Sequence, residues 1–94
     1  MATMAYIEDI ARHEGQEVSI RGWLHQRRSS GRIHFLIVRD GTGFIQGVMS
    51  KAGTDDETFR RADHLSQETA LIVTGTVRAD ARAPSGYELD VRAL

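Results

Sequence analysis

The sequence predicts a mainly β protein: a small barrel of five strands, with one helix between the third and fourth strands and a short helix before the first. Short runs with alternating or β-branched residues recur along the chain, which is typical of strands. Glycine-containing turns join the first three runs into an antiparallel meander. The chain has 94 residues, which is enough for one hydrophobic core, so residues 1–94 are expected to form a single domain.

A short helix is expected close to the N-terminus. Thr3 is a suitable N-cap, and Gly15 is a suitable stop. Between them, apolar residues recur at helical spacing: Tyr6, Ile7, Ile10 and Ala11. We therefore expect a helix that lies across one end of the barrel.

The first strand is expected over Glu17–Arg28, where apolar and polar residues alternate. Its apolar positions are Val18, Ile20, Gly22 and Leu24. A glycine inside a strand favours a bend or bulge, so Gly22 predicts a strongly coiled barrel strand.

Two turns and two further strands follow. Ser29–Gly31 predicts a turn, and Arg32–Asp40 is an almost continuously apolar strand. Asp40–Gly43 predicts a tight hairpin, and Phe44–Met49 is the third strand.

The second half of the chain predicts one helix and two strands. Thr54 and Glu57 have the spacing of a capping box, which predicts a helix to about Ser66. The helix is expected to bury Phe59, Ala62 and Leu65. Strands are expected over Thr69–Val77 and Tyr87–Val91, with a turn at Ala83–Gly86. This order of elements is that of the OB-fold, a Greek-key barrel whose face binds oligonucleotides or oligosaccharides.

The composition argues against several classes of protein. There are no cysteines, which excludes disulfides and thiolate metal sites. The four histidines lack the spacing of metal ligands, so no metal site is expected. Ser29 and Ser30 lack the context of a nucleophile elbow, so no catalytic residue is expected. No apolar run approaches the roughly 20 residues of a membrane span. We expect no contact with a membrane and a cytoplasmic location.

The charge distribution favours an anion partner although the net charge is only −1. Residues 18–39 contain five arginines and no acid. Three of these arginines, Arg27, Arg28 and Arg32, flank the first turn. Because this turn lies at the edge of the binding face in an OB-fold, the three side chains are candidate RNA contacts. A solvated hairpin tip explains the same charges equally well.

An aromatic residue and an amide are predicted to share one face of the sheet. Counting back from the second turn places Arg39 opposite Phe44 and Ile37 opposite Gln46. Phe35 and Gln46 are then near-diagonal neighbours. A ring beside an amide can stack on a nucleobase and hydrogen-bond its edge. Spacing alone leaves open the alternative that Phe35 belongs to the core.

The stretch from Val18 to Gln46 resembles the N-terminal anticodon-binding domain of class II asparaginyl-tRNA synthetases. The shared pattern consists of Gly22–Trp23, Arg27–Arg28, Phe35, Arg39–Asp40 and Gln46. Aspartyl enzymes have a related pattern, but Ser29–Gly31 and Asp40–Gly43 resemble the asparaginyl branch. The resemblance extends over essentially all of the chain.

The resemblance implies a role for several residues. Phe35 matches the phenylalanine that stacks on the middle anticodon base, a uridine, and Gln46 matches the glutamine that reads its edge. Arg28 matches an arginine near the third base. Glu88 matches the glutamate associated with the first base, a guanine, and Arg78 lies where the family has further basic contacts.

The implied partner is therefore the anticodon loop of a tRNA. The resemblance implies that this segment is not itself an enzyme, and that ATP and magnesium belong to a catalytic domain through which the full enzyme forms a homodimer. Three alternatives stay open: the corresponding domain of an aspartyl-tRNA synthetase, an OB-fold scaffold engineered as a protein-binding module, and a stand-alone single-strand binder.

Overall fold

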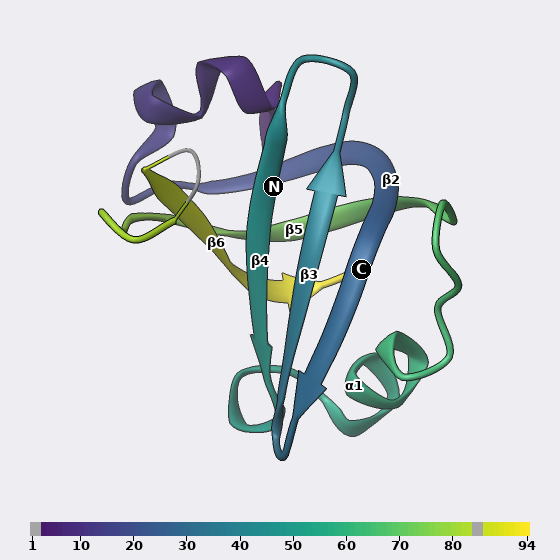
Figure 1. Cartoon of the computed structure of the whole chain (residues 1–94). Helices are drawn as coiled ribbons and strands as arrows, with labels where there is room; N and C mark the ends of the chain where they lie inside the picture. The colour runs from purple at the N-terminus through teal and green to yellow at the C-terminus, as the bar shows by residue number, and fades with distance from the viewer. Residues whose placement is uncertain (1–2, 84–85) are drawn as a thin grey trace.

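The computed structural model describes residues 3–83 and 86–94. In chain order, the elements are β1 (Thr3–Met4), the 3-10 helix η1 (Ile7–His13), β2 (Glu17–Ser30), β3 (Ile33–Arg39), β4 (Phe44–Ser50), the 3-10 turn η2 (Lys51–Gly53), α1 (Asp56–Ala62), β5 (Ala70–Ala79) and β6 (Tyr87–Ala93). The strands follow the order β1-β2-β3-β4-β6-β5, and an additional pairing between β2 and β5 closes the barrel. The predicted five-stranded OB barrel, with its helix between the third and fourth strands, is confirmed as β2 to β6 (Figure 1).

The strand β2 belongs to both halves of the barrel. Its residues 17–23 pair with β5, and its residues 23–30 pair with β3. Figure 1 shows the strand curving from one neighbour to the other. Gly22 lies at this change of partner, where a Cβ atom would come within 2.3 Å of the Arg39 carbonyl oxygen. The glycine therefore permits a backbone approach that a side chain would block. The break in register occurs further along, between Leu24 and Gln26.

The barrel interior is filled by aliphatic side chains from every long strand. The fully buried ones are Val18, Ile20, Leu24, Leu36, Val38, Met49, Val73, Val77, Leu89 and Val91. In β3, the buried positions alternate with half-buried ones. The predicted alternation in β2 holds from Ile20 to Leu24, but Ser19, predicted on the polar side, is buried as well. No helix in the described ranges is long and apolar enough to cross a membrane.

The N-terminal segment differs from the prediction. Thr3 is not a helix cap but part of β1, where it pairs in parallel with Val18. The helix is a 3-10 helix that begins after Tyr6, and its buried residues are Ile7 and Ile10 alone. Tyr6 is 63% exposed. Pairing with β2 satisfies the backbone of residues 3–4, so the chain turns into a helix only after them.

The helix α1 is also shorter than predicted. Its N-cap is Asp55, whose Oδ1 accepts a hydrogen bond from the Thr58 N–H at 2.7 Å. Thr54, the predicted cap, instead donates its hydroxyl to the Ser50 carbonyl. The helix ends at Ala62 rather than near Ser66. The next three N–H groups donate to carbonyls three residues earlier, so the chain continues as tight turns.

The turns joining the strands match the prediction in part. The hairpin between β3 and β4 pairs Arg39 with Phe44, as counted from the sequence. The first turn is tighter than predicted, because Ser30 pairs with Ile33 and the turn consists of residues 31–32. Part of the predicted turn at Ala83–Gly86 lies outside the described residues.

Asp40 joins η1 to the turn between β3 and β4. Its carboxylate accepts hydrogen bonds from the Ile7 N–H at 2.8 Å, the Thr42 N–H at 2.8 Å and the Thr42 hydroxyl at 2.6 Å. Partial burial raises the pKa of Asp40, but these hydrogen bonds together outweigh it and leave that pKa below its usual value.

We expect Asp40 to make folding sensitive to acid. Because its pKa is lower in the folded state, its stabilising effect is fully present above its unfolded pKa of about 3.9 and is lost as the pH falls through the folded value. Asp40→Asn should lower the melting temperature at neutral pH and reduce its fall below about pH 4. Thermal unfolding across this range measures both effects.

Glu14→Gln is the matched control, because Glu14 is exposed and lies outside this set of hydrogen bonds. An Asp40→Asn variant with an unchanged acid dependence would show that Asp40 does not hold η1 in place.

Candidate nucleic-acid interface

The register aligns outward-facing residues into two rows that cross five strands. The first row is Gln26, Ile37, Gln46, Glu88 and Arg78, on β2, β3, β4, β6 and β5. The second row is Arg28, Phe35, Val48, Asp90 and Thr76 on the same strands. Directly paired residues on neighbouring strands have side chains in contact distance. We call this surface the cross-strand face.

Phe35 lies on the cross-strand face rather than in the core. Its neighbours in the chain, His34 and Leu36, are buried, whereas Phe35 is half-buried. The guanidinium carbon of Arg28 lies 4.9 Å from the centre of the Phe35 ring. This is a cation–π contact, and it places a positive charge beside an aromatic surface.

Two hollows border Phe35 and Gln46. The larger, of about 380 Å³, is lined by Phe35, Gln46, Val48, Arg78, Asp80, Arg82, Ala83 and Glu88. The smaller, of about 120 Å³, is lined by Gln26, Arg28, Phe35, Ile37 and Gln46. Phe35 and Gln46 are common to both, so the ring and the amide separate two adjacent sites. This arrangement suits two neighbouring planar groups with polar edges.

A carboxylate on the floor of the larger hollow is held by an arginine. The side chain of Glu88 is 9% exposed, and its Oε1 lies 2.5 Å from Nη2 of Arg78. A buried carboxylate is costly unless it is paired. The ion pair fixes one oxygen of Glu88, and the carboxylate keeps further lone pairs for N–H donors of a ligand.

The loop after β5 forms the rim of the larger hollow. The Asp80 carboxylate accepts a hydrogen bond from the Arg82 N–H at 2.9 Å. This hydrogen bond is the largest contribution to the lowered pKa of Asp80. The loop therefore presents a negative charge as well as the exposed side chain of Arg82.

The structure brings five of the seven predicted site residues together: Arg28, Phe35, Gln46, Arg78 and Glu88. Arg27 is not among them. It pairs with Leu36 on the opposite side of β2, and its Nη1 lies 3.7 Å from Asp63 beside α1. Arg32 lies in the exposed turn between β2 and β3.

The predicted basic stretch is partly neutralised by acids from elsewhere in the chain. Arg27 pairs with Asp63, and Arg39 pairs with Glu68 while lying over the ring of Trp23. On the cross-strand face, Arg78 pairs with Glu88 and Arg82 pairs with Asp80. Among the described residues, the positive charge of this face that no acid pairs with therefore comes from Arg28.

Several residues of the face were missed by the sequence reasoning. On the two rows they are Gln26, Ile37, Val48, Thr76 and Asp90, and on the rim they are Asp80 and Arg82. Ile37 and Val48 follow from the same register count that identified Phe35. Gln26 did not, because strict alternation from Leu24 assigns it to the interior. Among the described residues, no group of three or more potential ligand side chains is arranged to hold a metal ion.

The sequence model of the OB-fold nucleic acid binding domain matches residues 18–94. The chain belongs to this family. It is also 61% identical over 89 residues to the asparagine–tRNA ligase of Thermus thermophilus, a match that covers 95% of this chain and 20% of that protein. This OB-fold domain thus spans about a fifth of the length of that relative.

Solved structures agree with the fold. One of them is asparaginyl-tRNA synthetase of Pyrococcus horikoshii, complexed with asparaginyl-adenylate, with a TM-score of 0.87 and 35% identity. The match covers all of this chain and 23% of the synthetase. Another is an OBody bound to hen egg-white lysozyme, with a TM-score of 0.80 and 22% identity. This match covers all of this chain and 94% of the OBody. The second likeness concerns the fold alone.

The position of Phe35 outside the core has a measurable consequence. Leu36→Ala empties a fully buried site and should lower the free energy of unfolding by about 2–5 kcal/mol. Phe35→Ala should cost about 1 kcal/mol, since its ring is only half-buried. Urea unfolding of both variants measures the difference. A loss of about 3–5 kcal/mol for Phe35→Ala, as for a buried phenylalanine, would assign the ring to the core.

Proposed function

We propose that this domain recognises the anticodon loop of a tRNA on behalf of an asparagine–tRNA ligase. The observation that carries the proposal is the grouping of Phe35, Gln46 and Glu88 on three neighbouring strands around two adjacent hollows. The ring can stack on an unpaired base, and the amide and the carboxylate can hydrogen-bond the edges of unpaired bases.

Each side chain has a distinct chemical role in this proposal. The Phe35 ring stacks on the middle base, which is a uridine. The Gln46 amide both donates and accepts, so it pairs with the donor and acceptor of the uridine edge. Glu88 accepts from the N–H groups of guanine at the first position. Arg28, on the other side of Phe35, lies toward the third base.

The remaining candidates contribute charge. Arg78 orients Glu88 through their ion pair. Arg32, and the rim residue Arg82, are exposed and can approach phosphates of the loop. Arg27 pairs with Asp63 beside α1, so it stabilises β2 from the side opposite the cross-strand face.

The match to a ligase favours this proposal over the alternatives raised by the sequence. The chain is 61% identical to the Thermus ligase over 95% of its length, and this identity supports the asparaginyl branch. The likenesses to an aspartyl enzyme at 24% identity and to the OBody at 22% identity show only a shared fold. We assign amino-acid activation, with its ATP and magnesium, and dimer formation to the remainder of the ligase.

Phe35→Ala and Gln46→Ala should weaken RNA binding in different ways. Stacking is worth about 1–3 kcal/mol and is nearly independent of the base. Phe35→Ala should therefore weaken binding to stem-loops with any middle base to a similar degree. Gln46→Ala should cost about 1 kcal/mol with uridine and reduce the preference for uridine. Fluorescence titrations with anticodon stem-loops that differ only at the middle position measure both effects.

Gln16→Ala is the control for Gln46→Ala, because Gln16 is exposed and lies outside the cross-strand face. The proposed roles are contradicted if Gln46→Ala leaves the preference for uridine unchanged, or if Phe35→Ala binds every stem-loop as tightly as the original chain.

A further inference from the structure

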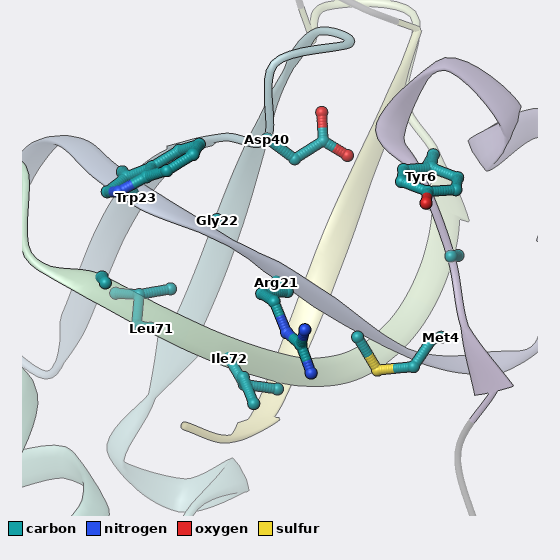
Figure 2. A pocket seen from close by; sticks show the side chains of 10 residues that line it. Met4, Tyr6, Arg21, Gly22, Trp23, Asp40, Leu71 and Ile72 are labelled. Carbon is teal, nitrogen blue, oxygen red and sulfur yellow. The ribbon is translucent and has the colours of Figure 1, made fainter.

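A third hollow, larger than the two on the cross-strand face, lies away from that face. It has a volume of about 570 Å³. It is formed by β1, the two residues between β1 and η1, the first half of β2, Asp40 and the start of β5. Its lining residues are Met4, Ala5, Tyr6, Arg21, Gly22, Trp23, Asp40, Ala70, Leu71 and Ile72. Figure 2 shows Arg21 between Met4 and Ile72, with Trp23 and Asp40 toward the other end. We call it the Arg21 hollow.

The Arg21 hollow is lined by most of the large hydrophobic side chains that are exposed in the described residues. Five large hydrophobic side chains are exposed in the described ranges, and four of them line it: Met4 at 51%, Tyr6 at 63%, Trp23 at 40% and Ile72 at 47%. Single exposed hydrophobic residues need no explanation, but a contiguous group of them marks an interaction surface. The tRNA contacts proposed above use none of these four residues.

The hollow is lined by two charged side chains, Arg21 and Asp40, and only Arg21 is available to pair with a partner. Asp40 already accepts three hydrogen bonds, from Ile7 and twice from Thr42. Within the part of the chain that the structure describes, no hydrogen bond or ion pair engages the guanidinium of Arg21. The charge that the hollow offers to a partner is therefore positive, and it is surrounded by apolar side chains.

We propose that the Arg21 hollow is the surface on which the rest of an asparagine–tRNA ligase docks, through an apolar segment that carries a carboxylate for Arg21. This inference rests on the proposed function. The Thermus ligase is about five times as long as the matched segment, since the match covers 20% of it. In such a ligase, the remaining four fifths of the protein are covalently linked to this domain and can cover its exposed apolar side chains.

Two other occupants fit the hollow less well. A second copy docked hollow to hollow would bring another Arg21, and Asp40, the acid that lines the hollow, is already engaged. An RNA backbone carries a charge at every nucleotide, and it would meet a single unengaged cation among apolar groups. A carboxylate-bearing apolar segment matches both the charge and the apolar lining.

The first test uses a small probe and the chain as it exists. 4-Phenylbutyrate is an apolar carboxylate, and 4-phenylbutanol is its neutral counterpart. In an NMR titration, both should shift the signals of Met4, Trp23 and Ile72, with the carboxylate binding about two- to fivefold more tightly, the range for an exposed ion pair. Arg21→Gln should abolish this preference, and the control Arg12→Gln should retain it. Equal binding of both probes to the original chain would overturn the proposed charge pairing.

The second test places the domain in a complete ligase. This chain replaces the matching segment of the Thermus enzyme, and tRNA-independent amino-acid activation reports that the catalytic part is folded. Hydroxyl-radical footprinting should show Met4 and Trp23 protected at least threefold relative to the isolated chain. Phe44 is 47% exposed and lies outside the hollow, so it should be labelled equally in both. Equal labelling of Met4 and Trp23 in both proteins overturns the proposal.

The other occupants would also be revealed by footprinting of the isolated chain. Protection that grows with protein concentration would assign the hollow to a second copy, and protection by an anticodon stem-loop would assign it to RNA. Either result overturns the proposal. The two hypotheses fail separately: loss of stem-loop binding with the hollow protected contradicts the proposed function alone, and an unprotected hollow with normal stem-loop binding contradicts docking alone.

Discussion

An extra residue in β2 determines which of its side chains reach the cross-strand face. The pairing of β2 with β3 runs from Leu24 opposite Val38 directly to Gln26 opposite Ile37, so His25 has no partner of its own. Such a bulge reverses the inside–outside alternation of every later residue in the strand. Without it, Arg28 would face the core and Arg27 the solvent. With it, Arg28 reaches Phe35, and Arg27 turns toward Asp63.

The bulge is stabilised by its surroundings. The His25 ring contacts the Phe44 ring edge-on, with 5.0 Å between ring centres. Beyond the bulge, Ser29 hydrogen-bonds the buried His34, whose ring lies against Phe59 of the α1 helix. The segment of β2 that carries Arg28 is thus fixed from the core side, which allows its outward side chains to be positioned for a ligand.

The sequence was most informative where local rules determine the structure. The Asp40–Gly43 turn fixed the register of β3 and β4, and this register placed Phe35 and Gln46 on one face. Glu88 lies beside them only because β4 pairs with β6, two strands that are distant in sequence. Its candidate role came from the family resemblance and not from the register. Thr3 and Thr54 were misassigned because strand pairing and a neighbouring aspartate compete with their capping tendency. The bulge decides that Arg28 faces outward and Arg27 inward, the reverse of what strict alternation gives. The sequence around His25 carries no local signal for this bulge.

The barrel presents two surfaces of different chemistry, both dependent on β2. Its second half contributes the cross-strand face, and its first half contributes the floor of the Arg21 hollow. A strand that changes partner at Gly22 thereby separates a polar, aromatic surface from an apolar one. In the two proposals above, this division lets one small domain bind RNA while it is joined to a larger protein.

The most direct test of this account is an NMR map of the isolated chain with an anticodon stem-loop. If the cross-strand face binds the anticodon loop, the shift changes follow the two rows, and those of Arg28, Phe35, Gln46 and Glu88 are among the largest. The signals of Met4, Arg21 and Ile72 are then unaffected. Changes concentrated on Arg27 and α1, or on the Arg21 hollow, would contradict it.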